Sequence, residues 1–304
     1  MRLDDLRYFI AVAEQAHVGR AAQRLGVSQP ALTKGVQRLE QALGLTLFDR
    51  GPRGMALTGV GTLFFERARH LCTGLDEAVQ EASDLHLGSI GTIRIGVSPI
   101  FADALAAQTF ALLRQQRPGA KARMAISLND TLLASLRLGD LDLSINALED
   151  AQPEGLLQEP LFDDELCVVL REDHPLLSRS HLRLADLAHC SWALPGVEVL
   201  ARRRVEARFA EQGLPPPDVV LQLDTSITLA SSVVRHSDLL SVMSRFSLRL
   251  PAGRGLVPLP LTDAAWPRRV GVVTRAGAYM SPLVHRFIEL LRERSQDFRV
   301  NDAH

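Results

Sequence analysis

The sequence has little of what defines several common classes of protein. Of its 304 residues only three are cysteines (Cys72, Cys167 and Cys190), an odd number with no CxxC spacing. This argues against both a disulfide framework and a zinc site, and favours a reducing compartment. No apolar run approaches the roughly 18–20 residues that span a bilayer, and the N-terminus (MRLDD) has acids where a signal peptide has an apolar core. We therefore expect a cytoplasmic protein without a membrane partner.

Sequence motifs for catalysis and metal binding are also missing. The nine histidines form no HxxxH or HExxH pair, and neither a nucleophile elbow nor a phosphate-binding loop occurs. Cys167 lies in an apolar run typical of a core strand, and Cys190 has no evident resolving cysteine for a redox switch. We therefore expect no enzymatic activity, no metal and no cofactor.

Lysine is almost absent, and the basic charge is carried by 32 arginines against Lys34 and Lys121. Arginine binds phosphate and guanine with two parallel hydrogen bonds, although genomic base composition is the safer explanation for the excess over the whole chain. The formal net charge of -1 hides an uneven distribution. Residues 1–60 hold 8 basic and 5 acidic residues, whereas residues 61–304 hold 26 and 30. A near-neutral total therefore does not exclude a nucleic-acid partner.

The first 58 residues show the pattern of a winged helix-turn-helix. Apolar spacing predicts helices over 3–16 and 20–25, the second ended by Gly26. Ser28 is a good N-cap for a third helix, which has a proline in its first turn and ends at Gly44. A short helix joined by a tight glycine turn to another helix is typical of helix-turn-helix proteins. Two short strands around a basic Gly/Pro turn then predict a wing over residues 45–58.

Residues 59–87 predict one long helix without proline, about 40 Å in length. Apolar residues recur along it at alternating spacings of three and four, which is a heptad seam. We expect this seam to pair two copies of the chain; the alternative is that it packs on the rest of the same chain. The seam consists of Phe64, Ala68, Leu71, Leu75, Ala78, Ala82 and Leu85.

From residue 91 onward, strands alternate with helices. This alternation predicts parallel sheets flanked by helices, in two βαβ series over 92–145 and 191–243. Connectors rich in Pro and Asp, at 153–164 and 258–268, would join two lobes that bind a ligand in the cleft between them. The expected strands are 92–97, 122–128, 141–145, 166–170, 191–194, 219–223, 239–243 and 269–274; the expected helices are 102–116, 132–138, 199–212, 227–235 and 281–294.

Two ungapped runs resemble the DNA-binding segment of LysR-type transcriptional regulators: AAQRLGVSQPALT at 21–33 and RLEQALGLTLFDR at 38–50. The run GDLDLSI at 139–145 resembles the approach to the third effector-domain strand of that family. The chain departs from the family at His17-Val18-Gly19, where the second helix usually starts with Ser or Thr. Thr33 and Lys34 stand where Ser and Arg are common, and Lys34 lacks the arginine fork.

The resemblance implies a mixed fold with three parts. These are a winged helix-turn-helix domain in 1–58, a linker and dimerisation helix in 59–88, and a two-lobed, periplasmic-binding-protein-like α/β effector domain in 89–304. Lobe I would comprise 91–161 and 268–304, and lobe II would comprise 162–267.

The start of the third helix is the candidate reading head for the major groove. Gln29 can bond adenine N6 and N7, and the neighbouring alanine and proline can meet a thymine methyl group. In the wing, arginines would contact phosphate and so position the protein without reading sequence. The alternative is a solvated helix face and an ordinary charged turn. The candidate DNA-binding residues are Ser28, Gln29, Pro30, Ala31, Thr33, Lys34, Arg38, Arg50 and Arg53.

The candidate effector site is built from strand ends and helix starts. Free N–H groups at a helix start favour anionic groups, but every such turn also prefers a capping residue, ligand or not. Strand ends near Trp192 and Met243 could line the same cleft, whereas the run Arg202–Arg204 is better explained as a solvated face. The candidate effector-binding residues are Ser98, Pro99, Asn129, Thr131, Pro195, Thr225 and Ser244.

Together these features predict a homodimeric or homotetrameric transcriptional regulator. It would bind a double-stranded DNA operator and respond to a small-molecule effector, which we expect to be an organic acid; RNA polymerase is a further candidate partner. The rival interpretation is a small-molecule-binding protein or enzyme that carries an accessory DNA-like module. Such a protein would turn a substrate over, or bind its ligand independently of DNA.

Overall fold

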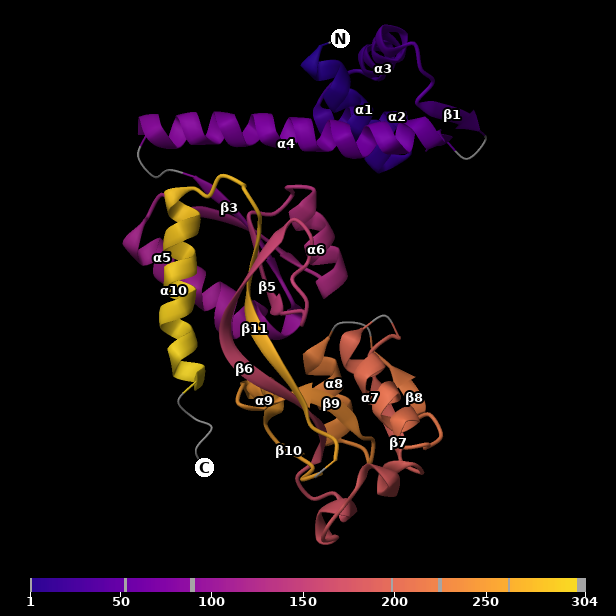
Figure 1. The fold of residues 1–304 in the computed structure, drawn as a ribbon, viewed down its shortest axis with the longest axis vertical. Helices are drawn as coiled ribbons and strands as arrows, with labels where there is room; N and C mark the ends of the chain where they lie inside the picture. Colours follow the sequence, from indigo (N-terminus) through magenta and orange to yellow (C-terminus); the bar gives the residue numbers. More distant parts are fainter. Residues whose placement is uncertain are drawn as a thin grey trace. The chain divides into compact units, whose positions relative to one another are not determined.

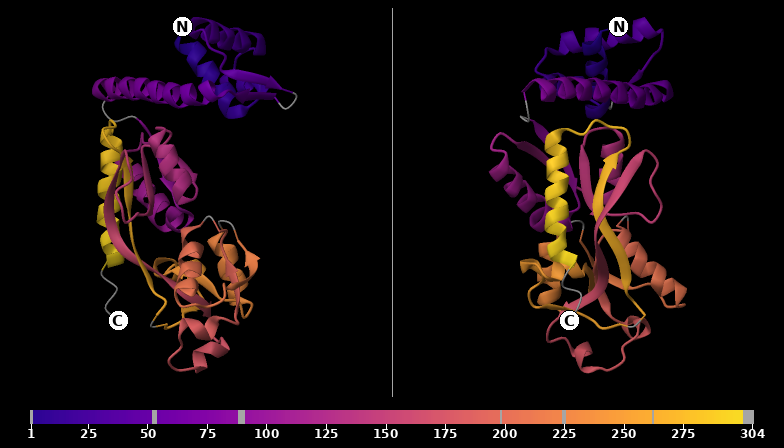
Figure 2. Two further views of the ribbon diagram at one scale, coloured as in Figure 1. Left: turned by 45° about the vertical axis from the view of Figure 1, so that its right-hand side comes forward. Right: turned by 60° about the vertical axis from the view of Figure 1, so that its left-hand side comes forward.

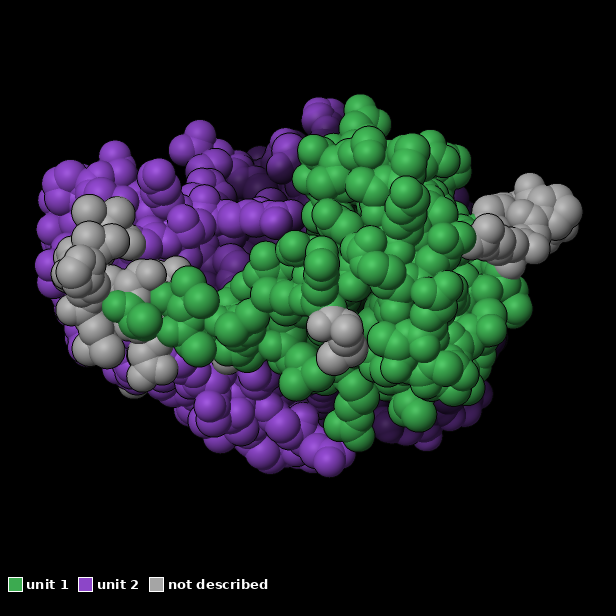
Figure 3. Space-filling view, turned by 90° about the horizontal axis from the view of Figure 1, so that it is seen from above, with its two compact units in different colours: residues 1–86, 138–140 green, residues 87–137, 141–304 purple. Residues whose placement is uncertain are grey.

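The computed structural model describes residues 2–51, 54–87, 91–197, 199–223, 226–261 and 263–299. Contacts divide the chain into two compact units, residues 1–86 with 138–140 and residues 87–137 with 141–304, which Figure 3 colours separately. Two predicted site residues, Arg53 and Thr225, lie outside the described residues, as do the side chains of Arg50 and Leu85. No helix within the described ranges is long and apolar enough to cross a bilayer.

Three short helices build the first unit, close to where the sequence predicts them. Their apolar faces meet in one core around Phe9, which is fully buried. Gly26 and Gly44 end the second and third helices with φ of 65° and 67°, left-handed conformations that glycine adopts without strain. The helices are α1 (Leu3–Gln15), α2 (Val18–Leu25) and α3 (Gln29–Leu43).

The predicted wing forms as an antiparallel hairpin of β1 (Phe48–Gly51) and β2 (Gly54–Leu57). The chain then enters α4 (Gly59–Leu87), the long helix, and the Gly61 N–H donates to Thr58 Oγ1 at 2.9 Å. A Cβ on Gly61 would lie only 2.1 Å from the Leu47 carbonyl oxygen. Glycine is therefore required where α4 starts against the strand leading into the wing.

The predicted dimer seam of α4 has different surroundings along its length: its first part packs in the core of the first unit, and its later part is exposed. Ala68 is fully buried in the core of the first unit, and the Phe64 ring lies 5.4 Å from that of Phe9. Both residues contribute to the core of their own chain, with Phe64 half-buried, and a role for them in pairing two copies stays a prediction. They serve the alternative, packing on the same chain, because a helix of this length must also close the core of the small winged domain. The remaining seam residues with described side chains are exposed: Leu71, Leu75, Ala78 and Ala82.

A mixed seven-stranded sheet and a small two-stranded sheet form the second unit, and Figures 1 and 2 show helices packed around them. In the first lobe β3 lies between β4 and β5, all parallel, as the βαβ pattern predicts. In the second lobe β7 and β8 are parallel. The strands are β3 (Thr92–Val97), β4 (Lys121–Ile126), β5 (Leu143–Ala147), β6 (Leu156–Arg171), β7 (Ser191–Leu194), β8 (Asp218–Gln222), β9 (Ser241–Ser244), β10 (Leu256–Pro258) and β11 (Trp266–Arg275).

The connector predicted at 153–164 falls largely in the long strand β6, whereas the one predicted at 258–268 links β10 to β11 and reaches into β11 only at its end. β6 and β11 pair antiparallel along most of their length, and β6 also pairs antiparallel with β9 and β10. Purely parallel sheets were therefore the wrong expectation. Pro160 is accepted because it lies opposite Gly271 at a bulge, where a Cβ on Gly271 would lie 2.2 Å from the Glu159 carbonyl oxygen.

The second unit has two main apolar cores. One lies around β3, β5 and the closing helix, and the other lies around Trp192 and Phe209, whose rings are 5.9 Å apart. The helix expected at 102–116 is divided into a π-helical segment and α5, with a 3-10 turn before it, and the short α9 and β10 were not predicted. The helical segments are η1 (Pro99–Phe101), η2 (Ala102–Ala107), α5 (Gln108–Gln116), α6 (Asn129–Arg137), α7 (Leu200–Glu211), α8 (Ile227–Arg235), α9 (Arg245–Leu248) and α10 (Pro282–Arg299), with 3-10 turns at Pro175–Ser178, Leu184–Leu187 and Pro251–Gly253.

Candidate functional site

The start of α3 projects from the first unit as the sequence predicts. Leu32, Val36 and Leu39 are buried, which turns the opposite face of the helix to solvent. Ser28 Oγ accepts a hydrogen bond from the Ala31 N–H at 3.4 Å and caps the helix. Thr33 is half-buried, whereas the other candidate side chains of the first turns are exposed: Ser28, Gln29, Pro30, Ala31 and Lys34. Their role in DNA contact stays a prediction.

Arg38 has a structural partner that the sequence did not suggest. Its Nη2 lies 2.5 Å from Oδ1 of Asp5, a carboxylate that is 1% exposed and also accepts from the Arg2 N–H at 3.3 Å. The hydrogen bond that Arg38 donates to the Asp5 carboxylate raises the pKa of Arg38. The Arg38 side chain is 47% exposed, so part of it faces solvent while its charge holds α1 against α3.

The start of α2 corrects one expectation. The helix begins at Val18, earlier than predicted, and His17 caps it: Nδ1 accepts from the N–H groups of Gly19 and Arg20 at 3.0 and 3.3 Å. The imidazole therefore supplies the cap that a serine or threonine at Gly19 would otherwise provide. A Cβ on Gly19 would lie 3.8 Å from Gln29 Oε1, so this cap adjoins the start of α3.

A cavity of about 540 Å³ lies in the second unit, lined by residues from both lobes. This volume is within the range of small-molecule sites. The structure brings together, at its wall, all the predicted effector residues that fall within the described ranges: Ser98, Pro99, Asn129, Thr131, Pro195 and Ser244. Their contact with a ligand stays a prediction, because lining a cavity also follows from position in the fold.

Capping differs from one helix start to another around the cavity, and α8 begins at residue 227 as predicted. Ser98 makes no side-chain cap bond to any described residue, and the segment it opens is a three-residue 3-10 turn. α8 is capped by Ser226, whose Oγ accepts from the Leu229 N–H at 3.3 Å. Ser244 Oγ donates to a carboxylate instead of capping α9. The starts of α6 and α8 lie at the cavity wall, and anion binding at these N-termini stays a prediction.

A chain of hydrogen bonds orients Asn129. Ser144 Oγ donates to Asn146 Oδ1 at 2.6 Å, and Asn146 Nδ2 donates to the Ala147 carbonyl at 3.1 Å and to Asn129 Oδ1. Because a backbone carbonyl only accepts, the Asn146 atom that faces it must be the amide nitrogen. Asn129 Oδ1 is thereby occupied, and its Nδ2 remains as a donor at the cavity wall.

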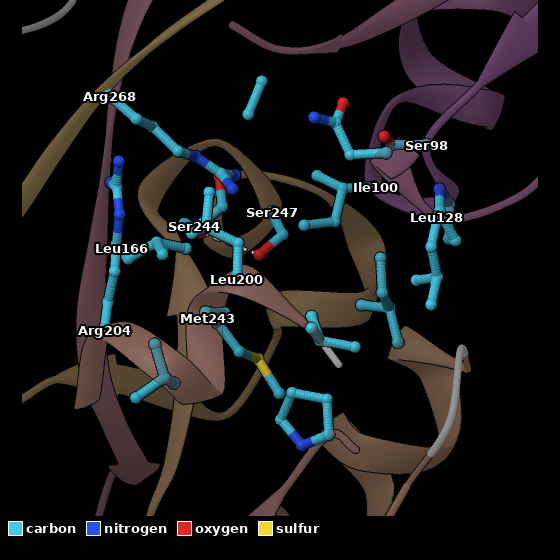
Figure 4. A pocket seen from close by; sticks show the side chains of 18 of the residues that line it. Ser98, Ile100, Leu128, Leu166, Leu200, Arg204, Met243, Ser244, Ser247 and Arg268 are labelled. Atoms are coloured by element: carbon cyan, nitrogen blue, oxygen red, sulfur yellow. Dashed lines mark hydrogen bonds between the residues drawn. The ribbon is translucent and has the colours of Figure 1, made fainter. Parts of the chain in front are cut away.

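An ion pair at the cavity was missed by sequence reasoning. Arg268 in β11 lies directly opposite Asp164 in β6, and Nε donates to Asp164 Oδ2 at 2.8 Å. Asp164, 1% exposed, also accepts from Ser244 Oγ at 2.9 and 2.7 Å and from the Phe246 N–H at 3.2 Å. Figure 4 shows Arg268 reaching toward Ser244 and Ser247. The sequence contained one hint of this pair: each of the two segments interpreted as connectors ends in one of its members, Asp164 or Arg268.

The cysteines lack the features of a redox site. Cys167 is buried, and burial raises the pKa of its thiol to about 12. Burial also raises the pKa of Cys72 and Cys190. Reactive thiolates require a lowered pKa. Within the described ranges, no group of three or more His, Cys, Asp or Glu side chains is placed to hold a metal ion.

A winged helix-turn-helix unit joined to a two-lobed unit with a ligand-sized cavity defines a DNA-binding transcriptional regulator with a substrate-binding domain. Residues 3–62 match the bacterial regulatory helix-turn-helix protein, lysR family, and residues 87–296 match the LysR substrate binding domain. The chain belongs to the LysR family of transcriptional regulators.

Several known proteins are similar along most of the chain. The HTH-type transcriptional regulator GbpR of Azospirillum brasilense is 34% identical over 81% of this chain and 72% of its own. The SDS degradation transcriptional activation protein of a Pseudomonas strain is 35% identical over 92% of each chain. A full-length OxyR point variant of Pseudomonas aeruginosa has a similar structure, with a TM-score of 0.69, 27% identity, and 97% and 95% of the two chains covered.

Proposed function

We propose that this LysR-family protein binds a specific DNA operator and that a small anionic organic ligand in the cavity of its second unit controls that activity. The observation that carries the proposal is the presence, in one chain, of an exposed α3 start and a cavity of about 540 Å³. The domain limits are those expected from the sequence: DNA binding in 1–58, a linker helix in 59–88 and effector binding in 89–304. We further propose a cytoplasmic location, where a regulator of transcription meets its operator.

Sequence reading is assigned to the first turns of α3. Gln29 is exposed there and can form hydrogen bonds with an adenine edge. Lys34 and Arg38 lie further along the helix and are proposed to contact phosphate groups. Arg50 and Arg53 in the wing are proposed as further phosphate contacts. Ser28, Pro30, Ala31 and Thr33 complete the proposed surface.

Pairing of two copies is assigned to the exposed face of α4. Apolar side chains that a soluble helix would normally bury recur along this face, with exposed fractions from 40% to 68%: Val60, Leu63, Leu71, Leu75 and Val79. Ala78 and Ala82 continue the face as small residues that allow close approach. A dimer would present two reading heads to the half-sites of one operator, and two dimers would form a tetramer.

An anionic ligand is supported by the donors at the cavity wall, among them Arg268 and the free amide of Asn129. A relative is named for activation of SDS degradation, and SDS is a sulfate on an alkyl chain. We propose the same general chemistry, an acidic group on an organic body, for the ligand of this chain. Ser98, Pro99, Thr131, Pro195, Thr225 and Ser244 are proposed to surround it.

A gel shift with the DNA upstream of the gene tests the regulator function. We expect sequence-selective binding that weakens steeply with salt, because phosphate contacts release counterions. Gln29→Ala should relax the base preference, whereas the exposed Gln37, further along the helix, serves as a matched control as Gln37→Ala. Wild-type protein that binds all DNA equally, or none, would refute the proposal and favour the rival small-molecule protein or enzyme.

A further inference from the structure

We propose that Arg268 selects the ligand of the cavity by binding an oxyanion, a carboxylate or a sulfate, while the apolar body of the same molecule fills the remaining space. This inference rests on the proposed function only in taking the cavity as the ligand site. It assigns to one residue the choice between charged and neutral ligands.

Arg268 is a buried cation with unused hydrogen-bonding capacity. Its side chain is 9% exposed, yet it lines the cavity. Nε donates to Asp164, and Nη2 lies 2.7 Å from the same carboxylate oxygen without forming a hydrogen bond to any described residue. Nη1 likewise has no acceptor in the described part of the chain. Within the described residues, Nε makes the hydrogen bond to Asp164, so guanidinium N–H groups remain that a ligand or water in the cavity can meet.

The surroundings hold this guanidinium in one place. Asp164 is fixed by Ser244 Oγ and the Phe246 N–H, and the Phe101 ring lies 5.8 Å from the Arg268 guanidinium carbon. The Arg268–Asp164 pair is formally neutral, so an anionic ligand would be bound through guanidinium N–H groups that Asp164 does not use. A pre-positioned arginine fork suits the two oxygens of a carboxylate or sulfate.

The other charged groups of the wall are arranged differently. Arg203 is 53% exposed and lies 4.0 Å from Asp130, and Arg204 Nη1 donates to the Pro267 carbonyl at 3.3 Å. Glu149 and Asp150 line the cavity from exposed positions. Negative charge therefore lies at the solvent side and the buried cation lies inside, an arrangement that favours one anionic group on a ligand over two.

Apolar side chains form most of the remaining wall. Figure 4 shows Ile100, Leu128, Leu166, Leu200 and Met243 around the space that Arg268 approaches. Burying an alkyl or aryl body against such a surface is favourable, because apolar area is removed from water. The same surface offers few hydrogen-bond partners to a polyhydroxylated ligand. The ligand class is therefore an amphipathic organic oxyanion.

Isothermal titration calorimetry of the full-length protein with octanoate, octyl sulfate and 1-octanol tests this assignment. The three probes share one apolar chain and differ in the head group, and the two oxyanions distinguish a carboxylate from a sulfate preference. We expect the preferred oxyanion to bind at least about tenfold more tightly than 1-octanol, the effect of a charge-assisted hydrogen-bond pair. Equal affinity for 1-octanol, or no oxyanion binding at about 1 mM, would overturn the proposal.

Substitutions locate the selectivity. The paired change Arg268→Met with Asp164→Asn removes both charges, so neither is left buried alone. It should lower oxyanion affinity about tenfold or more while leaving 1-octanol within about threefold. Arg269→Met removes the same charge from the exposed neighbour in β11 and should keep the wild-type ratio. A folded double variant that keeps the ratio would refute the role of Arg268.

A third variant covers the case in which the double variant does not fold. Arg268→Lys keeps the charge opposite Asp164 but lacks the fork, so the preference for the oxyanion should fall by about threefold or more. Retention of the full preference in this variant would equally contradict the proposal. Operator binding, measured in parallel by gel shift, distinguishes the two proposals: its absence in the wild type refutes the regulator function, whereas the head-group ratio alone decides the role of Arg268.

Discussion

Leu71 provides the sharpest test of how two copies of this chain associate. Its side chain is 68% exposed on α4, in line with other exposed apolar residues, whereas Ala68 one turn earlier is buried in the protein's own core. Leu71→Ala removes three carbon atoms. At about 0.8 kcal/mol per carbon buried, and with roughly two thirds of the side chain available to a partner, the loss is about 1.6 kcal/mol per copy. A twofold interface contains Leu71 from both copies, so the loss of association free energy doubles to about 3 kcal/mol. This corresponds to a more than 100-fold rise in the dimer Kd.

Sedimentation velocity over a range of protein concentrations measures that constant, and circular dichroism checks the fold. Leu71 contributes little to the folded monomer because it is already in solvent, so the far-ultraviolet spectrum should not change. His70→Ala is the matched control, since His70 is exposed and lies about 100° around the helix from Leu71. A Leu71→Ala protein that dimerises within about threefold of the wild type would refute the proposed interface, because its predicted effect is far larger.

Three further predictions concern the fold. Gly61→Ala places a Cβ 2.1 Å from the Leu47 carbonyl and should cost about 1–3 kcal/mol in urea unfolding, whereas Gly59→Ala, with open space around it, should change stability by much less. His17→Ala removes the cap of α2 and should cost about 1 kcal/mol; His17→Asn restores a capping oxygen and should recover most of that loss, and equal stability of all three proteins would argue against the cap. Cys167, with its pKa raised to about 12, should resist a thiol reagent at pH 8 until the protein unfolds. As pH rises, the Cys167 thiol of the unfolded chain ionises before that of the folded chain. The contribution of Cys167 to the free energy of unfolding should therefore be complete below about pH 9 and should decline toward pH 12. Cys167→Ala should remove this decline.

Local patterns were sufficient for most elements of the fold. The caps of α3, the long α4 and the parallel strands β3, β4 and β5 follow from residues close together in the chain, because turn chemistry and helix or strand periodicity are short-range properties. The predicted effector residues at strand ends meet at one cavity for the same reason: the carboxyl ends of parallel strands share one edge of a sheet.

Pairing between strands that are far apart in the sequence could not be predicted from local patterns. Proline-containing segments were expected to be connectors, but Pro160 and Pro267 lie in strands, and Pro160 is tolerated at a bulge where its missing N–H is not needed. Whether a proline is tolerated in a strand depends on the neighbouring strand: Pro160 of β6 lies opposite Gly271 of β11. The register of β6 against β11 is likewise not encoded near either strand.

Local residue patterns are enough to identify the parts of this chain: a helix-turn-helix with its exposed first turns, a long amphipathic helix, and two α/β lobes. Which side chains of these parts contact one another depends on how the parts pack. A heptad pattern marks an apolar stripe, but the core around Phe9 decides that Phe64 and Ala68 turn inward and Leu71 does not. Asp164 and Arg268 are 104 residues apart and become partners only through strand pairing. Periodicity specifies a face of an element; what that face meets depends on the packing of distant segments.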